Sequence, residues 1–140
     1  MKNGAGKMAR DCFALRVRML NRVVSAIYDD ALAPLDLKAS QLNVLVAASL
    51  RPRARPAELC KRLRMDESTL SRNVQRMRRR GWLRLAPDSD RRSHWIAATR
   101  QGRMLVVRAF AAWSTAQKEI ERRLGRDGQA ALRMLAGKLL

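Results

Sequence analysis

Cysteine, histidine and acidic residues are scarce in this chain of 140 residues. Two cysteines and one histidine cannot supply the three or four ligands of a zinc site, and they leave little capacity for structural disulfides. No glycine-rich phosphate loop, serine nucleophile with a partner base or carboxylate pair stands out. The sequence therefore predicts neither an enzyme nor a bound cofactor or metal.

Long apolar runs are also missing. The longest run without a charged residue, 39–50, is shorter than the roughly 20 residues of a membrane-spanning helix. Lysines and arginines at positions 2, 7, 10, 16 and 18 interrupt any apolar export signal near the start. We therefore expect a cytoplasmic protein with no membrane partner.

Basic residues, in contrast, are abundant. The chain has 30 lysines and arginines against 12 acidic residues, a formal net charge of +18, and 16 of the basic but 5 of the acidic residues fall in 51–103. This excess predicts a polyanionic partner, and its concentration in one segment favours nucleic acid over a membrane surface. Charge alone would suit a ribosomal or nucleoid protein equally well.

Residues 66–81 have the pattern of a DNA-reading helix. Asp66 suits the N-cap, where its carboxylate accepts amide hydrogens of the first turn, and Gly81 suits the C-terminal stop. An apolar stripe at helical spacing is formed by Leu70, Val74 and Met77. The opposite face carries groups that bind phosphates and base edges, on Ser68, Arg72, Gln75 and Arg79. The plain alternative is a solvated helix with arginines on its outer face.

The segments on either side of this helix favour DNA binding. A short helix opened by Pro56 comes first, with Cys60 as the small residue at a tight helix crossing and Arg64 at a turn where glycine is common. Downstream, the strand-like residues 82–85 and 94–97 flank a turn-rich tip. Helix, turn, helix and a basic two-stranded wing together predict a winged helix-turn-helix.

These residues resemble the multiple-antibiotic-resistance regulator (MarR) family of bacterial transcription factors. The similarity is carried by residues 57–63 (AELCKRL), 68–74 (STLSRNV), 80–83 (RGWL) and 90–92 (DRR), the last followed by Ala98 and Thr99. Ala98 replaces a leucine that is usual in the family, which predicts loose packing at that strand end. The resemblance implies a mostly α fold with a small β-wing, in which long terminal helices dimerise.

We expect three parts: an N-terminal helix in 1–38, the winged helix-turn-helix in 39–99 and C-terminal helices in 100–140. Within the first part, residues 1–7 should be frayed and a single helix should run over 9–31, ended by Pro34. Ser40 is expected to cap the next helix.

Two helices are expected after the wing, at about 99–124 and 127–140, with Gly125 and Gly128 between or near them. The aliphatic surface of the first and last helices exceeds what one small winged core can cover. We therefore expect a twofold homodimer, and an intrachain helix bundle is the alternative.

A dimer would present two recognition helices about 34 Å apart, which demands a palindromic, inverted-repeat operator in double-stranded DNA. Arg72 and Arg76 can each bind guanine through two hydrogen bonds. Arg91 or Arg92 is expected in the minor groove, with Asp90 holding the wing tip together. The predicted DNA contacts are Ser68, Thr69, Ser71, Arg72, Gln75, Arg76, Arg79, Arg91 and Arg92, with further phosphate contacts from Arg78, Arg80 and Arg84.

Cys12 is a candidate redox sensor. Residues 12–15 resemble the opening of the hydroperoxide-sensing branch of the family, in which oxidation of a thiolate there releases DNA, although no paired tyrosines lie near. The alternative is a small apolar residue in the dimer base. The family also implies a small, often aromatic effector bound between the dimer helices and the winged module.

The expected function is a sequence-specific transcriptional regulator, a repressor released by a ligand or by oxidation. The alternative is an architectural protein that binds nucleic acid mainly through charge, which a specificity ratio of about 10³ or more for operator over random DNA would exclude. A thiol enzyme that uses Cys12 and His94 is a third hypothesis, but nothing in the sequence brings these groups together. His94 is more simply read as structural or phosphate-contacting.

Overall fold

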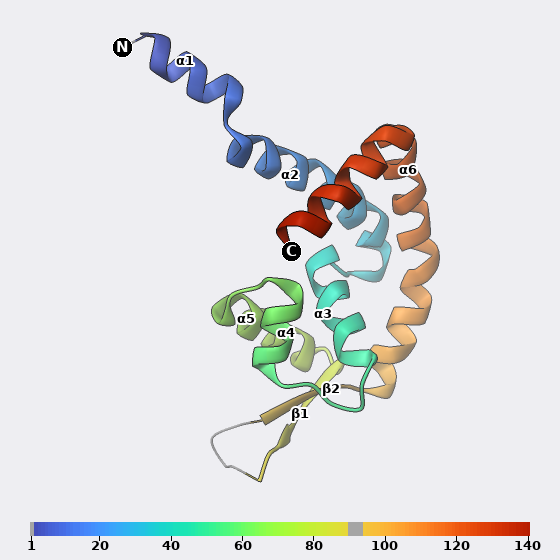
Figure 1. Cartoon of the computed structure of the whole chain (residues 1–140). Coiled ribbons are helices and arrows are strands. Elements are labelled where there is room, and N and C mark those ends of the chain that lie inside the picture. Colours follow the sequence, from blue (N-terminus) through green and yellow to red (C-terminus); the bar gives the residue numbers. More distant parts are fainter. Residues whose placement is uncertain (1, 90–93) are drawn as a thin grey trace.

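The computed structural model describes residues 2–89 and 94–140, which form a mostly helical fold with a two-stranded antiparallel wing (Figure 1). The predicted fold class is confirmed. The elements in chain order are α1 (Lys2–Asp11), α2 (Phe13–Leu32), the 3₁₀ turn η1 (Ala33–Leu35), α3 (Ala39–Ser49), α4 (Pro56–Leu63), α5 (Glu67–Arg79), β1 (Leu83–Pro87), β2 (His94–Ala98) and α6 (Arg100–Leu139).

Helix α3 is the centre of the core. It lies between α6 on one side and α4 and α5 on the other (Figure 1), and Val44, Leu45 and Ala48 are fully buried along it. One apolar cluster reaches from Leu32 in α2 to Ala109 in α6 and includes the buried side chains of α4, α5 and the wing. The winged module and the long helices are therefore joined by a shared core.

The start of α3 corrects the expectation for Ser40. The N-cap is Lys38, whose amide donates to Oε1 of Gln41 at 3.0 Å, while the amide of Ala39 donates to Oδ1 of Asp29 at 2.8 Å. Gln41 and Asp29 thus bind the amides of Lys38 and Ala39 at the start of α3. Ser40 follows the N-cap by two residues, lies inside the first turn and is not the cap.

The N-terminal segment differs from the predicted frayed start and single helix. Residues 2–11 form α1, and Cys12 separates it from α2 with an extended backbone (φ −70°, ψ 109°). The Sγ atom of Cys12 accepts a hydrogen bond from the amide of Leu15 at 3.4 Å, so the thiol occupies the N-cap of α2. As expected, Pro34 follows the end of the helix, which stops at Leu32.

Helix α6 contains a break at Gly125, where φ is 63° and ψ is −176°. Glycine adopts this left-handed φ without the clash that a side chain would create. The prediction of two helices separated near Gly125 is confirmed, and the last segment turns back across α2 in the view of Figure 1, so that Leu140 contacts Arg64 at the end of α4. Within the described part of the chain, no helix combines the length and apolar character needed to cross a membrane.

The wing ends in a tight joint with α6. The strands pair in register from Leu83 with Ala98 to Pro87 with His94. Ala98 is 3% exposed, so the expected loose packing is wrong. The absence of a side chain at Gly102 allows α6 to approach the wing closely, because a Cβ there would lie 2.1 Å from the carbonyl oxygen of Trp82.

Candidate nucleic-acid interface

Helix α5 begins at a well-formed cap, as the sequence predicts. Oδ1 of Asp66 accepts from the amide of Thr69 at 2.8 Å and from the hydroxyl of Ser68 at 2.6 Å, and Oδ2 accepts from the hydroxyl of Thr69 at 2.7 Å. These bonds, above all those from the side chains of Ser68 and Thr69, hold the pKa of the Asp66 carboxyl well below its usual range.

The cap also fixes what Ser68 and Thr69 can offer to a ligand. Each hydroxyl has one proton, and both protons are donated to Asp66. The exposed Ser68 therefore has lone pairs left for donors such as the amino groups of adenine or cytosine in the major groove. Thr69 is half-buried and its hydroxyl oxygen already accepts from Arg72 at 3.3 Å, which leaves it one lone pair for such a donor.

The two faces of α5 are arranged as predicted. Leu70, Val74 and Met77 are buried at 2%, 5% and 0% exposure, and Asn73 is buried beside them, which sequence periodicity did not indicate. The exposed positions are Ser68, Ser71, Arg72, Gln75, Arg76, Arg78 and Arg79, with Thr69 half-buried. One row of cations, hydroxyls and an amide thus faces solvent along the helix.

Helix α5 ends at Gly81, also as predicted. Gly81 has φ 73°, its amide donates to the carbonyl of Arg78 at 2.9 Å, and the amide of Trp82 donates to the carbonyl of Met77 at 2.9 Å. This pair of bonds satisfies carbonyls that the helix end leaves free. The exit angle of the chain into β1 is thereby fixed.

Arg80 differs from the phosphate contact that the sequence predicts. Its guanidinium forms an ion pair with Asp36, donates to the carbonyl of Asp36 at 2.5 Å, and lies 4.5 Å from the centre of the Trp82 ring. Asp36 itself has a left-handed backbone with φ 52°. Arg80 therefore ties the end of α5 to the junction between α2 and α3.

The turn between α4 and α5 has the expected form. Pro56 is the first residue of α4, and Arg64 takes the left-handed conformation (φ 50°) that glycine usually provides. The amide of Met65 donates to the carbonyl of Cys60 at 3.0 Å. Burial, and then the carboxylates of Glu67 and Asp66, raise the pKa of the Cys60 thiol, so it stays protonated and is unsuited to act as a nucleophile.

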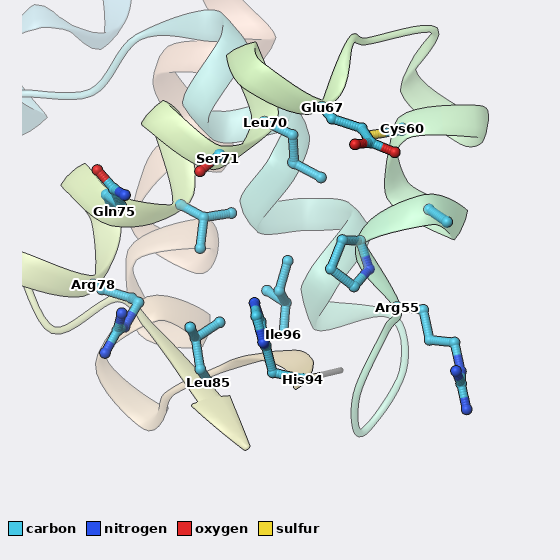
Figure 2. A pocket seen from close by; sticks show the side chains of 13 residues that line it. Arg55, Cys60, Glu67, Leu70, Ser71, Gln75, Arg78, Leu85, His94 and Ile96 are labelled. Atoms are coloured by element: carbon cyan, nitrogen blue, oxygen red, sulfur yellow. The ribbon is translucent and has the colours of Figure 1, made fainter. Parts of the chain in front are cut away.

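A hollow of about 470 Å³ lies between α4, α5 and the wing (Figure 2). Ser71, Gln75 and Arg78 of α5 line one side, and Arg55 and His94 line the other. A second hollow brings together Arg78, Arg79 and Arg84, three of the arginines that the sequence predicts to contact DNA. The basic surface is therefore continuous from the recognition helix to the wing.

The base of the wing holds residues that sequence reasoning missed. Trp95 in β2 makes cation–π contacts with two arginines, and the guanidinium carbons of Arg53 and Arg55 lie 4.3 and 4.5 Å from the ring centre. Arg55 also pairs with Asp88 at 3.2 Å. The predicted wing-tip residues Asp90, Arg91 and Arg92 lie outside the described residues.

The remaining candidates are placed away from this surface. Cys12 is exposed between α1 and α2, at the opposite end of the molecule from the wing strand that His94 begins (Figure 1). Among the described residues, no group of three or more His, Cys, Asp or Glu could hold a metal ion.

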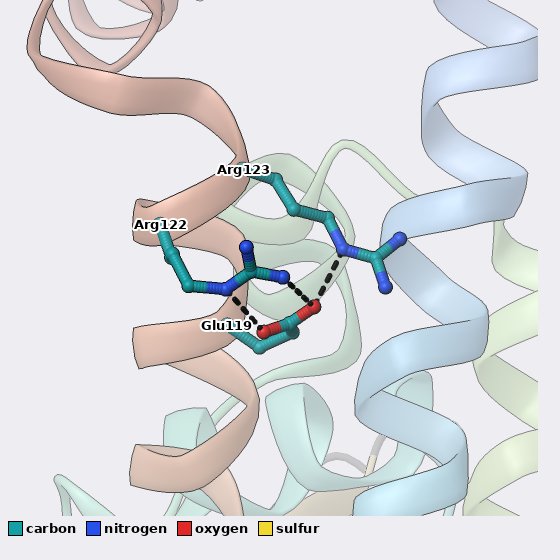
Figure 3. A network of polar contacts seen from close by, with 3 residues as sticks. All are labelled: Glu119, Arg122 and Arg123. Carbon is teal, nitrogen blue, oxygen red and sulfur yellow. Dashed lines mark hydrogen bonds and ion pairs between the residues drawn. The ribbon is translucent and has the colours of Figure 1, made fainter.

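Glu119 belongs to a local network on α6. Its carboxylate accepts from Arg122 at 2.9 and 3.0 Å and from Arg123 at 2.7 Å (Figure 3). These bonds lower the pKa of Glu119 to about 2. The three residues lie within two turns of one helix, which is the usual setting for surface charges that support a helix.

The capped and exposed α5, the preceding α4 and the β1–β2 wing define a winged helix-turn-helix. Residues 35–93 match the sequence model of the MarR family. The multiple antibiotic resistance protein MarR of Escherichia coli K12 is 27% identical over 126 residues, covering 89% of this chain and 88% of that protein.

Solved structures agree. A mutant of E. coli MarR complexed with operator DNA matches with a TM-score of 0.84 and 25% identity, covering 96% of this chain and 97% of that one. The Mycobacterium tuberculosis transcriptional regulator MOSR, in complex with DNA, matches with a TM-score of 0.74 and 29% identity over 93% of this chain and 100% of that one. The family model, the relative and the solved structures together support a winged-helix regulator of the MarR family, which confirms the resemblance read from the residues.

Proposed function

We propose that this protein is a transcriptional regulator that binds operator DNA through α5. The observation that carries the proposal is the exposed row of cations, hydroxyls and an amide on a helix whose opposite side is locked into the core. The likeness to a MarR structure that is complexed with operator DNA supports it. The relatives named above are described as regulators, and no enzymatic role is proposed.

Within α5, the predicted contacts divide by chemistry. Arg72 and Arg76 are the guanine readers of the proposal, and Ser68 and Thr69 accept hydrogen bonds from base amino groups. Arg78, Arg79 and Arg84 bind phosphates, which adds affinity without sequence information.

Selection of bound sequences from random duplexes at near-physiological salt tests this assignment. The wild type should enrich one motif, and Arg72→Met should lose preference at one base pair per half-site and weaken binding by about 5- to 150-fold for each half-site, the effect of roughly 1–3 kcal/mol per contact. Arg108→Met, on the exposed surface of α6, removes the same charge and should keep the motif. An identical motif for Arg72→Met and the wild type would refute the assignment.

The second part of the proposal is a homodimer formed through α2 and the end of α6. Both carry large apolar side chains in water: Phe13 is 80% exposed, Leu20 60% and Leu139 78%. Exposed apolar residues at helical spacing, such as Phe13, Val17 and Leu20, form a stripe that a second copy can cover. The twofold axis then dictates an inverted-repeat operator.

Sedimentation equilibrium tests the dimer. The wild type should have twice the mass of the chain, Leu20→Asp should shift it toward the monomer, and Met104→Asp, also at an exposed apolar position, should leave the mass unchanged. A monomeric wild type would refute the dimer. A selected motif that is not a repeat would refute the inverted-repeat operator.

The charge of +18 favours one competing function, an architectural protein with little sequence preference. The two functions differ in the ratio of affinities for the selected motif and for random DNA, which should reach about 10³ or more for a regulator. Flat enrichment with tight, steeply salt-dependent binding would favour the architectural function.

We also propose that a small ligand releases the DNA. A largely apolar hollow of about 440 Å³ between α3, α4 and α6 supports this, with Val46 on its wall and the stacked rings of Phe110 and Trp113 at its edge. Benzoate and related aromatic acids should weaken operator binding by the wild type. They should have less effect on Val46→Phe, in which the larger side chain fills the hollow, and an equal effect on both would refute this site.

Release by oxidation of Cys12 remains a second mode of control in the proposal. Cys12→Ser is a suitable test because serine keeps an N-cap acceptor while it removes the thiol. Peroxide should weaken operator binding by the wild type and leave Cys12→Ser unaffected. If peroxide leaves both proteins with equal affinity, oxidation of Cys12 has no role.

A further inference from the structure

Two arginine side chains contact the Trp95 ring at the wing base, and the backbone explains why. Ala54 pairs with Ile96, with reciprocal amide-to-carbonyl hydrogen bonds of 2.8 Å, so the segment before α4 adds a short third strand to the wing. Side chains alternate along extended backbone. The buried Ala54 therefore places Arg53 and Arg55 on the opposite face, where Trp95 also lies.

This arrangement leaves the arginines available to an anion. Each guanidinium contacts the indole ring as a cation, and this contact does not occupy its N–H groups with an oxygen acceptor. Both arginines are exposed, and among the described residues Arg53 has no carboxylate at ion-pair distance. Arg55 shares its charge with Asp88 at 3.2 Å, which leaves some of its five donors free.

The position of the two arginines adjoins the DNA-reading surface. Arg55 is on the rim of the hollow whose other side is formed by Ser71, Gln75 and Arg78 of α5 (Figure 2). If α5 enters a major groove and the wing the adjacent minor groove, the phosphate strand between those grooves passes over the space between α5 and the wing base.

We propose that Arg53 and Arg55 bind DNA backbone phosphates between the two grooves, and that Trp95 is a positioning residue that holds both guanidiniums ready. This inference rests on the proposed DNA-binding function and adds residues outside the recognition helix and the wing tip. Stacking restricts two long side chains before DNA arrives, so less conformational entropy is lost on binding.

The test is the slope of log K against log salt for the selected operator duplex, because each phosphate contact contributes about 0.9 to it. Arg53→Met and Arg55→Met should each lower the slope by about 1.8 in a dimer, and the double variant by about 3.6. Arg108→Met serves as the charge-matched control and should leave the slope nearly unchanged. The sequence motif should be the same in every variant.

Trp95 is tested by paired substitutions. The indole Nε1 is buried without a hydrogen-bond partner in the described part of the chain, so Trp95→Phe keeps an aromatic face and loses no such bond. Trp95→Phe should retain most of the wild-type slope, whereas Trp95→Leu should approach the double arginine variant.

The possible failures are distinct. A wild type that shows no sequence preference overturns the proposed regulator and this inference with it. A specific wild type whose salt slope is unchanged in the double arginine variant overturns the phosphate contacts alone. A lower slope in the arginine variants but not in Trp95→Leu overturns the positioning role of Trp95.

Discussion

Substitution of Gly102 by alanine is expected to disturb both stability and DNA binding. A Cβ at Gly102 would lie 2.1 Å from the carbonyl oxygen of Trp82 and 3.1 Å from Cδ1 of Leu45. Real Cβ atoms essentially never come closer than 3.0 Å to such atoms, so backbone must move by about 1 Å. The same carbonyl accepts the amide of Thr99 at 3.0 Å, so that hydrogen bond weakens as well.

Gly102→Ala should lower the free energy of unfolding by about 2–4 kcal/mol. Roughly 1–3 kcal/mol of this comes from overpacking and about 1 kcal/mol from the weakened hydrogen bond. For a chain of 140 residues, this corresponds to a fall in Tm of roughly 7–14 °C. Thermal unfolding followed by circular dichroism, at fixed protein concentration, measures the change because a dimer's Tm depends on concentration.

The matched control is Gly137→Ala in the same helix, where a Cβ would meet nothing within 4 Å. Alanine should raise stability there by roughly 0.5–1 kcal/mol, because glycine loses more backbone entropy in a helix. The reasoning fails if Gly102→Ala unfolds at or above the wild-type Tm. Operator affinity should fall in Gly102→Ala and stay unchanged in Gly137→Ala.

Two further outcomes are expected from residues on α5 and α6. Gly81→Ala should lower the free energy of unfolding by about 1–2 kcal/mol, because φ is 73° at this position. Gly81→Asn should lower it by less, since asparagine tolerates a left-handed backbone better. Equal Tm values for wild type and Gly81→Ala would contradict this. The pKa of Glu119 is lowered to about 2 in the fold, so its bonds with Arg122 and Arg123 stabilise the protein above the unfolded pKa and are lost as pH falls toward 2. The stability difference between wild type and Glu119→Gln should therefore be largest near neutral pH and vanish in acid, as urea unfolding at several pH values would show.

The recognition helix could be predicted because its signals are local. Asp66 accepts from the hydroxyl of Ser68 and the amide of Thr69, two and three residues away, and Gly81 ends the helix through its own backbone. The exposed and buried faces follow from helical spacing alone. Cys12 was harder to interpret, because a thiol is a weak hydrogen-bond acceptor and is a poor signal of a helix start.

Other features depend on residues far apart in the sequence. Asp36 pairs with Arg80 across 44 positions, so a charge that looked free for phosphate is engaged within the chain. The Arg53–Trp95–Arg55 stack needs the backbone pairing of Ala54 with Ile96, which no periodicity in either segment indicates. Sequence reasoning therefore assigned Arg80 to phosphate although it is paired within the chain, and it did not single out Arg53 and Arg55.

The hydroxyl of Thr99 joins the end of the recognition helix to the start of α6. It donates to the carbonyl of Gly81 at 2.6 Å and accepts from the amide of Gly102 at 3.0 Å. Because both helices are hydrogen-bonded to this one side chain, a tilt of α6 is transmitted to the end of α5. The part of α6 from residue 100 to the break at Gly125 is about 37 Å long. If the end near Gly125 is held, a tilt of about 5° therefore displaces the end at residue 100 by about 3 Å. That is close to the rise of one base pair. In the proposed dimer, an angular error of a few degrees where the two copies meet would therefore move the DNA-binding end of α6 by about one base pair along the operator.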